Sequence, residues 1–351
     1  MLAAISYPLA ALVGYVGARS DVPLAWMLGP LLFAACLSVA GLPLAPNGKL
    51  RRLGQTLIGV GVGLNFTAEA MRELMSRFPL MVLTALLSVL VACIASVALA
   101  RFARLDRATA FFACLPGGLA EMAEIGQSSG ARPEAVTILH TLRVTLVVMT
   151  VPPLLIALGT PDLGLQTQAQ SVSVGWVIGL GLGGLVVALG LGKIHLRNPY
   201  MIGAILFSAV LSANGMIVGK LPPILFAGAQ LLVGFAVGCR FRRDILMTLP
   251  RAAAVGTLVI LAIMGVMALF GWLLALRLGV PFASGLLSST PGGLAEMGVT
   301  AQLLHLGVPS IIGFQITRVV MVNGFATQYF VMLTRSGVFS YLERMLGGRG
   351  G

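Results

Sequence analysis

The chain has 351 residues, of which 58% are hydrophobic and only 10% are charged, and its formal net charge is +12. Soluble domains carry roughly 45–50% apolar and about 25% charged residues, so this chain has more apolar side chains than soluble cores can bury. The composition therefore excludes a soluble enzyme, a soluble DNA-binding domain and a disordered tail, and it predicts a polytopic membrane protein.

Ten apolar runs along the chain approach the roughly 20 residues that a helix needs to cross a bilayer. The five runs of the first half lie near 2–18, 22–42, 50–66, 78–100 and 133–158. The five runs of the second half lie near 175–192, 198–216, 222–239, 252–276 and 309–334. Between the halves, residues 159–174 are polar and contain no Lys or Arg. We therefore expect a first membrane repeat at 1–158, a linker at 159–174, a second membrane repeat at 175–335 and a cytoplasmic C-terminal tail at 336–351.

The clearest sequence feature is an internal duplication. The heptapeptide Pro-Gly-Gly-Leu-Ala-Glu-Met at 116–122 recurs letter for letter at 291–297, which is 175 residues later. The same offset relates Arg143 to Arg318 and Gly59 to Gly234. Identity over co-linear segments indicates that the chain is one ancestral unit fused to itself.

The two segments that carry the heptapeptide, 108–130 and 283–304, are either a sixth span in each half or hairpins that enter and leave on one side. In the loops and at the ends of the spans there are 21 basic residues once Arg143 and Arg318 are set aside. If the two segments cross the membrane, 11 basic residues lie on one side of it and 10 on the other. If the segments are re-entrant, 16 lie on one side and five on the other. The positive-inside rule favours the hairpins, although broken spanning helices stay open as an alternative.

This topology predicts an all-α polytopic membrane protein with ten spans and both termini in the cytoplasm. Five spans per half insert the halves upside down, which gives two inverted repeats of about five transmembrane helices, each with one re-entrant or broken Pro-Gly-Gly helix. The two Pro-Gly-Gly tips then enter from opposite faces and meet near the bilayer midplane. The expected location is the inner (plasma) membrane.

The Pro-Gly-Gly triplets at 116–118 and 291–293 are difficult positions for a continuous helix, because proline lacks a donor and glycine tolerates many φ values. One interpretation is a simple interhelical turn at the surface. The functional interpretation is an anion site at each tip, where the amides of the returning helix are exposed. The residues assigned to it are Gly117, Gly118, Gly292 and Gly293, with hydroxyls from Ser288, Ser289 and Thr290.

Glu121 and Glu296 lie three residues beyond the tip glycines, within the first turn of the returning helix. A carboxylate there can simply complement the helix N-terminus. Alternatively, an intramembrane carboxylate marks a proton or cation relay.

Arg143 and Arg318 lie about ten residues from either end of the last span of each half, which is too deep for easy snorkelling. Each needs a partner, and Glu121 and Glu296 are the expected partners in a structural ion pair. Alternatively, the guanidinium groups bind an anionic substrate bidentately. His140 and Gln315 stand one turn earlier at matching positions, and Asn323 is a further polar residue in the last span.

The paired heptapeptides resemble the AbrB-type duplicated membrane protein family, over nearly the whole chain. More distantly, the chain is similar to the superfamily of cation/proton antiporters and anion transporters with paired re-entrant hairpins. Labels attached to the family include a regulator of gene expression and an ammonia monooxygenase. The second label fits poorly, because oxidising ammonia needs a redox metal and the three histidines are scattered.

Together these features predict a secondary transporter of a small organic anion, coupled to H⁺ or Na⁺. The alternative is a membrane-embedded sensor that affects gene expression indirectly. We expect no enzyme activity, no catalytic residue, no cofactor and no metal. The expected partners are a small anionic solute, a coupling cation, the lipid bilayer and a second copy of the chain in a homodimer, without direct binding of nucleic acid.

Overall fold

The computed structural model describes residues 2–20, 22, 24–42, 44–159, 170–193, 198–240 and 249–339. Within these ranges the chain is helical and has no strand; a single isolated bridge joins Ser171 to Lys220. Most of the predicted linker (160–169) and most of the predicted C-terminal tail (340–351) lie outside the described residues.

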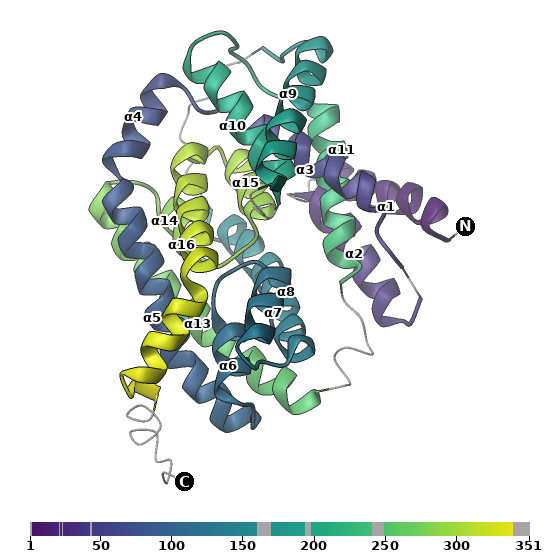
Figure 1. Ribbon diagram of the computed structural model, residues 1–351. Coiled ribbons are helices and arrows are strands. Elements are labelled where there is room, and N and C mark those ends of the chain that lie inside the picture. The colour runs from purple at the N-terminus through teal and green to yellow at the C-terminus, as the bar shows by residue number, and fades with distance from the viewer. Residues whose placement is uncertain are drawn as a thin grey trace. The chain divides into compact units, whose positions relative to one another are not determined.

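The helices follow one another with short connections (Figure 1). Those of the first half are α1 (Leu2–Arg19), α2 (Ala25–Val39), α3 (Gly48–Gly63), α4 (Ala68–Ser76), α5 (Phe78–Ala103), α6 (Arg107–Cys114), α7 (Leu119–Ser128) and α8 (Pro133–Ala157). Those of the second half are α9 (Val174–Lys193), α10 (Pro199–Ala213), α11 (Pro223–Gly238), α13 (Pro250–Leu278), α14 (Phe282–Ser289), α15 (Leu294–Leu303) and α16 (Val308–Arg335).

Each of the ten apolar runs forms a helix, as predicted. Five helices are long and apolar enough to cross a membrane: α5, α8, α9, α13 and α16. Three others, α2, α10 and α11, are apolar but only 15, 15 and 16 residues long. The longer helices leave large apolar side chains uncovered, such as Val186 of α9, which is 70% exposed. Such a surface suits contact with lipid and not with water.

The chain divides into two compact units, and each unit takes helices from both halves of the sequence. Unit 1 comprises Met1–Ser76, Leu155–Arg243 and Gly293–Ile312. Unit 2 comprises Arg77–Leu154, Asp244–Gly292 and Gly313–Gly351. The two sequence repeats are therefore interleaved in space and do not form one unit each.

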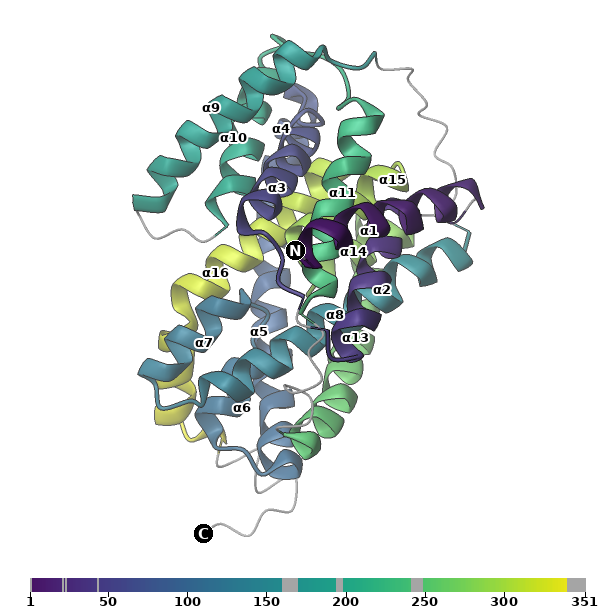
Figure 2. The ribbon, with the colours of Figure 1, turned by 90° about the vertical axis from the view of Figure 1, so that its right-hand side faces the viewer.

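In unit 1 the third helix of each repeat packs against the second helix of the other repeat. Helix α3 contacts α10, and α11 contacts α2 (Figure 2). Glycines allow this close approach, because a Cβ on Gly59 would collide with the Met201 carbonyl and a Cβ on Gly234 with the Met27 carbonyl. The glycines of the third helix in each repeat therefore serve close helix packing.

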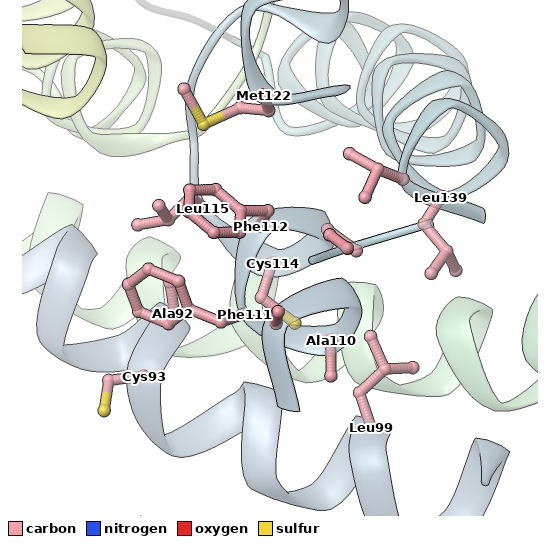
Figure 3. Close-up of a cluster of buried hydrophobic side chains, with 14 of the residues drawn as sticks. Ala92, Cys93, Leu99, Ala110, Phe111, Phe112, Cys114, Leu115, Met122 and Leu139 are labelled. Atoms are coloured by element: carbon pink, nitrogen blue, oxygen red, sulfur yellow. The ribbon is translucent and has the colours of Figure 1, made fainter. Parts of the chain in front are cut away.

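In unit 2 the short helix that precedes each Pro-Gly-Gly triplet packs against the long helix before it. Helix α6 contacts α5, and α14 contacts α13. Phe111, Phe112, Leu115 and Met122 are completely buried in one hydrophobic cluster with α5 and α8 (Figure 3). This cluster fixes the end of α6 and the start of α7, and so it positions the loop between them.

Candidate functional site

Both Pro-Gly-Gly triplets interrupt a helix, as predicted. Helix α6 ends at Cys114 and α7 begins at Leu119, while α14 ends at Ser289 and α15 begins at Leu294. Pro116, Gly117, Thr290 and Pro291 are buried. The alternative of a simple turn at the surface is therefore wrong, and these loops belong to the interior of the protein.

Arg143 holds the first loop by its backbone. Its Nη1 donates to the Leu115 carbonyl at 2.6 Å and its Nη2 to the Gly117 carbonyl at 3.0 Å. His140 Nε2 lies 2.9 Å from the Phe112 carbonyl, and His140 Nδ1 lies 3.1 Å from Arg143 Nη2. A neutral imidazole with its proton on Nε2 satisfies both contacts. These bonds supply partners for carbonyls that the end of α6 leaves without an intrahelical donor.

Arg318 holds the second loop in the same way. Its Nη1 donates to the Thr290 carbonyl at 2.9 Å and its Nη2 to the Gly292 carbonyl at 3.4 Å. The Gln315 amide donates to the Leu287 carbonyl and, at 3.1 Å, to that of Thr290. The Gln315 Oε1 accepts from Arg318 Nη2, as His140 Nδ1 does from Arg143.

The two arrangements, which we call the first and second arginine clamps, share four equivalent hydrogen bonds. The second clamp has two more, from Arg318 Nη1 to the Ser289 carbonyl at 3.3 Å and from the Gln315 amide to the Thr290 carbonyl. The carbonyls of Phe112, Leu115 and Gly117 in the first clamp correspond to those 175 residues later in the second, namely Leu287, Thr290 and Gly292. Arg143 lies ten residues after the start of α8 and Arg318 ten residues after the start of α16. The sequence duplication is therefore also a duplication of this hydrogen-bond network, and both copies lie in unit 2.

The predicted ion pairs between these arginines and Glu121 or Glu296 are wrong. The guanidinium forks bind loop carbonyls, and among the described residues neither arginine has a carboxylate partner. Arg143 is 4% exposed and Arg318 is 2% exposed, and the Nε–H group of each has no partner.

The two glutamates occupy the first turns of α7 and α15, as predicted. A Cβ on Gly118 would collide with the Glu121 carboxylate, and a Cβ on Gly293 would collide with the Glu296 carboxylate. Each carboxylate therefore folds back over the N-cap glycine of its own helix, which is the position of a capping group. Glu121 is half-buried and Glu296 is 7% exposed.

The first loop has one further contact that the sequence does not reveal. The backbone N–H of Gly118 donates to Asn323 Oδ1 on α16, at 3.3 Å. The residue 175 positions earlier is Val148, so the second loop has no equivalent amide acceptor from α8. The only sequence signal for this contact is the presence of an amide side chain within an apolar helix.

The first clamp borders a small cavity. Its volume is about 10 Å³, and its lining residues include Arg143, Leu139, Gly256 and Ile263. Such a volume has room for about one water molecule. Position 256 corresponds to Met81 in the other repeat, whose side chain is buried and whose Sδ accepts from Thr317 at 3.9 Å. The two clamps therefore differ in the packing around them.

Residues 26–334 match the family described as "Transition state regulatory protein AbrB". "Uncharacterized protein YhjN" of Bacillus subtilis (strain 168) is 25% identical over 345 residues, which cover 91% of this chain and 90% of that protein. "Putative regulator AbrB" of Escherichia coli (strain K12) is 25% identical over 319 residues, which cover 88% of this chain and 90% of that protein.

Proposed function

Because this chain belongs to the AbrB family of membrane proteins, we propose that it is a secondary transporter of a small organic anion, coupled to H⁺ or Na⁺. The anion binds at the two Pro-Gly-Gly loops that Arg143 and Arg318 hold. The observation that carries the proposal is the pair of buried guanidinium groups, which have no carboxylate partner among the described residues.

The energetic argument starts from the cost of burying an arginine, which is roughly 2.5–3.5 kcal/mol at the centre of a membrane helix on insertion scales. Loop carbonyls satisfy the N–H groups of the fork, but a carbonyl dipole offsets only part of a full positive charge. A buried positive charge that is only partly offset favours an anion beside it. The first turn of α7 adds partial positive charge in the same unit.

The proposed transport mechanism uses inverted repeats. The support is the 16-to-5 distribution of basic residues together with two helices that break at equivalent positions. In this arrangement the loop at 115–118 opens from the cytoplasmic side and the loop at 290–293 from the outside. Both termini lie in the cytoplasm, and the protein resides in the inner membrane.

Glu121 and Glu296 are the groups that we propose for coupling. Each carboxylate occupies the N-terminus of its own helix, where it competes with a substrate anion for the same amides. Protonation or binding of a cation removes that competition and admits the anion. Glu121→Gln and Glu296→Gln should therefore abolish or uncouple proton-driven uptake while the protein still folds. Glu134→Gln, at an exposed position of α8, is the control and should leave uptake unchanged.

The second candidate is a membrane-embedded sensor that binds an anion without moving it. The name of the Escherichia coli relative, a regulator, favours this candidate. An untargeted metabolite-uptake screen with purified protein in proteoliposomes separates the two. Accumulation of a small organic anion under an imposed H⁺ or Na⁺ gradient supports the transporter, whereas binding without accumulation supports the sensor and contradicts our proposal.

A further inference from the structure

Three hydroxyl residues precede the second Pro-Gly-Gly tip, and only one of them is free to bind a ligand. Ser288 Oγ donates to the Ser284 carbonyl at 2.7 Å, and Ser289 Oγ donates to the Met267 carbonyl at 2.8 Å. Thr290 Oγ1 has no hydrogen-bond partner, although the residue is only 1% exposed. A buried hydroxyl without a partner is unfavourable, which makes this group exceptional among the three.

A second donor without a partner lies on the residue that contacts Thr290. Arg318 Nη1 donates to the Thr290 carbonyl at 2.9 Å, while Arg318 Nε has no partner and is buried. The two free donors therefore belong to side chains in one hydrogen-bonded cluster, and one of them carries a positive charge. The matching part of the first loop has no such pair, since Leu115 stands where the second loop has Thr290.

We propose that Thr290 Oγ1 and Arg318 Nε bind the carboxylate group of a small monocarboxylate, so that the second clamp is the specificity-determining half of the site. This inference rests on the proposed function, because it names the ligand class of the same site. Two donors match the two oxygens of a carboxylate. A phosphate brings three or more acceptor oxygens and close to two charges, which would leave buried acceptors without partners.

Thermal unfolding of the purified protein in detergent tests this inference. The probes are sodium acetate, pyruvate and lactate at constant pH and ionic strength, with sodium phosphate and sodium chloride as the other arms. We expect saturable stabilisation of the wild-type protein by at least one monocarboxylate and none by phosphate or chloride. Thr290→Val, which is nearly isosteric, should raise the half-saturating concentration about 10- to 100-fold, and Thr290→Ser should restore it.

Ser288→Ala is the matched control for Thr290→Val, and the two variants should differ in their melting temperatures without ligand. Ser288→Ala removes a hydroxyl that already has a partner, so it should lower the melting temperature without ligand but leave the half-saturating concentration unchanged. Thr290→Val removes a hydroxyl that has no partner, so without ligand it should melt at or above the wild-type temperature. If Thr290→Val does not fold, Thr290→Ala beside Thr290→Ser makes the same comparison.

The inference is overturned if Thr290→Val binds the monocarboxylate as the wild type does, if phosphate or chloride stabilises equally, or if no monocarboxylate of the set stabilises the protein. These outcomes are distinct from a failure of the proposed function. If uptake occurs but does not depend on Thr290, the proposed carboxylate site is wrong and the transport function stands. If binding depends on Thr290 but no uptake occurs, the carboxylate site stands and the sensor function is supported.

Discussion

In the first clamp Arg143 bonds the carbonyls of Leu115 and Gly117, and in the second clamp Arg318 bonds the carbonyls that stand 175 residues later. Three bonds to the backbone are equivalent in the two clamps, although the second clamp has two more and several side chains around them differ. Because hydrogen bonds to equivalent carbonyls occur in both copies, they serve a structural requirement that both loops have. That requirement is to hold an interrupted helix inside the membrane protein, where carbonyls without donors are costly.

The differences between the clamps indicate where the two halves have separate roles. His140 stands in the first clamp where Gln315 stands in the second, and Leu115 stands where the second has Thr290. The first clamp borders a cavity beside Gly256, at a position where the other repeat has a methionine. We infer that the shared bonds maintain the loops, whereas the differing residues determine which loop recognises the anion.

The largest expected effect is the loss of either guanidinium group. Arg143→Met removes the side-chain donor to the Leu115 and Gly117 carbonyls. Arg318→Met removes the donor to the Ser289 and Gly292 carbonyls, whereas the Thr290 carbonyl keeps Gln315 as a donor. Each unsatisfied group costs about 1–3 kcal/mol. We therefore expect each variant to lose about 2–6 kcal/mol of stability, measured by thermal or denaturant unfolding in detergent. Arg132→Met is the control, since Arg132 is half exposed and pairs with Asp106 at 3.5 Å, a pair worth less than about 1 kcal/mol. If the clamp variants melt like this control, the clamps do not hold the loops.

The next largest effect is expected from loss of the side chains that contact the two arginines, His140 in the first clamp and Gln315 in the second. His140→Leu removes the donor to the Phe112 carbonyl, and Gln315→Leu removes the donor to the Leu287 carbonyl. The Thr290 carbonyl, which Gln315 also contacts, keeps Arg318 as a donor. At about 1–3 kcal/mol for each unsatisfied carbonyl, the two variants should lose similar amounts of stability, each about 1–3 kcal/mol. Unfolding of the two variants beside the wild type measures both losses. A variant that melts like the wild type contradicts the hydrogen bond assigned to that side chain.

A smaller effect concerns the glycines under the glutamate carboxylates. Gly118→Ala and Gly293→Ala each place a Cβ against the carboxylate of Glu121 or Glu296. Because the carboxylate is the flexible end of its side chain, it can rotate away, at a cost of about 0.5–1.5 kcal/mol. Adding Glu121→Ala to Gly118→Ala should recover most of that loss. Gly228→Ala is the control, because a Cβ at Gly228 meets open space and alanine favours the helix. Failure of the double variant to recover stability shows that the carboxylate does not lie over the glycine.

The smallest expected effect comes from making the clamps alike. His140→Gln gives the first clamp the side chain of the second, and an amide can keep both contacts, with the Phe112 carbonyl and with Arg143. We expect stability within about 1 kcal/mol of the wild type and an unchanged pH profile of uptake. A shifted pH profile of uptake with unchanged stability would contradict this expectation. It would identify His140 as a proton carrier, a role that Gln315 of the second clamp cannot have.

Much of the fold follows from the sequence, because apolar runs and Pro-Gly-Gly triplets act locally. Ten helices lie where the runs predict them, and both triplets end a helix. Helix α4 (Ala68–Ser76) is absent from the prediction because it is short and polar on one face, with Glu69 and Arg72 in nine residues. The interleaving of the repeats depends on tertiary contacts such as that between α3 and α10, which no local pattern specifies.

The candidate site was predictable in its residues but not in its contacts. The depth of Arg143 and Arg318 requires partners, and a sequence offers only side chains as candidates, so the opposite charges of Glu121 and Glu296 were the expected choice. The actual partners are backbone carbonyls, which every residue has and which become available only where a helix stops. The free hydroxyl of Thr290 is likewise a property of the folded loop.

Cysteine accessibility in oriented vesicles tests most directly whether the two loops are inverted copies. Cysteines at Leu119 and Leu294 suit the test, because both residues are half-buried and stand at equivalent positions, 175 apart. Gly117 is unsuitable, since a Cβ there would lie 2.6 Å from Asn323 Oδ1. Cys36, which is exposed, is first replaced by serine. With an impermeant maleimide, Leu119→Cys should react from the cytoplasmic side and Leu294→Cys from the outside. Labelling of both variants from the cytoplasmic side alone would contradict the inverted-repeat account.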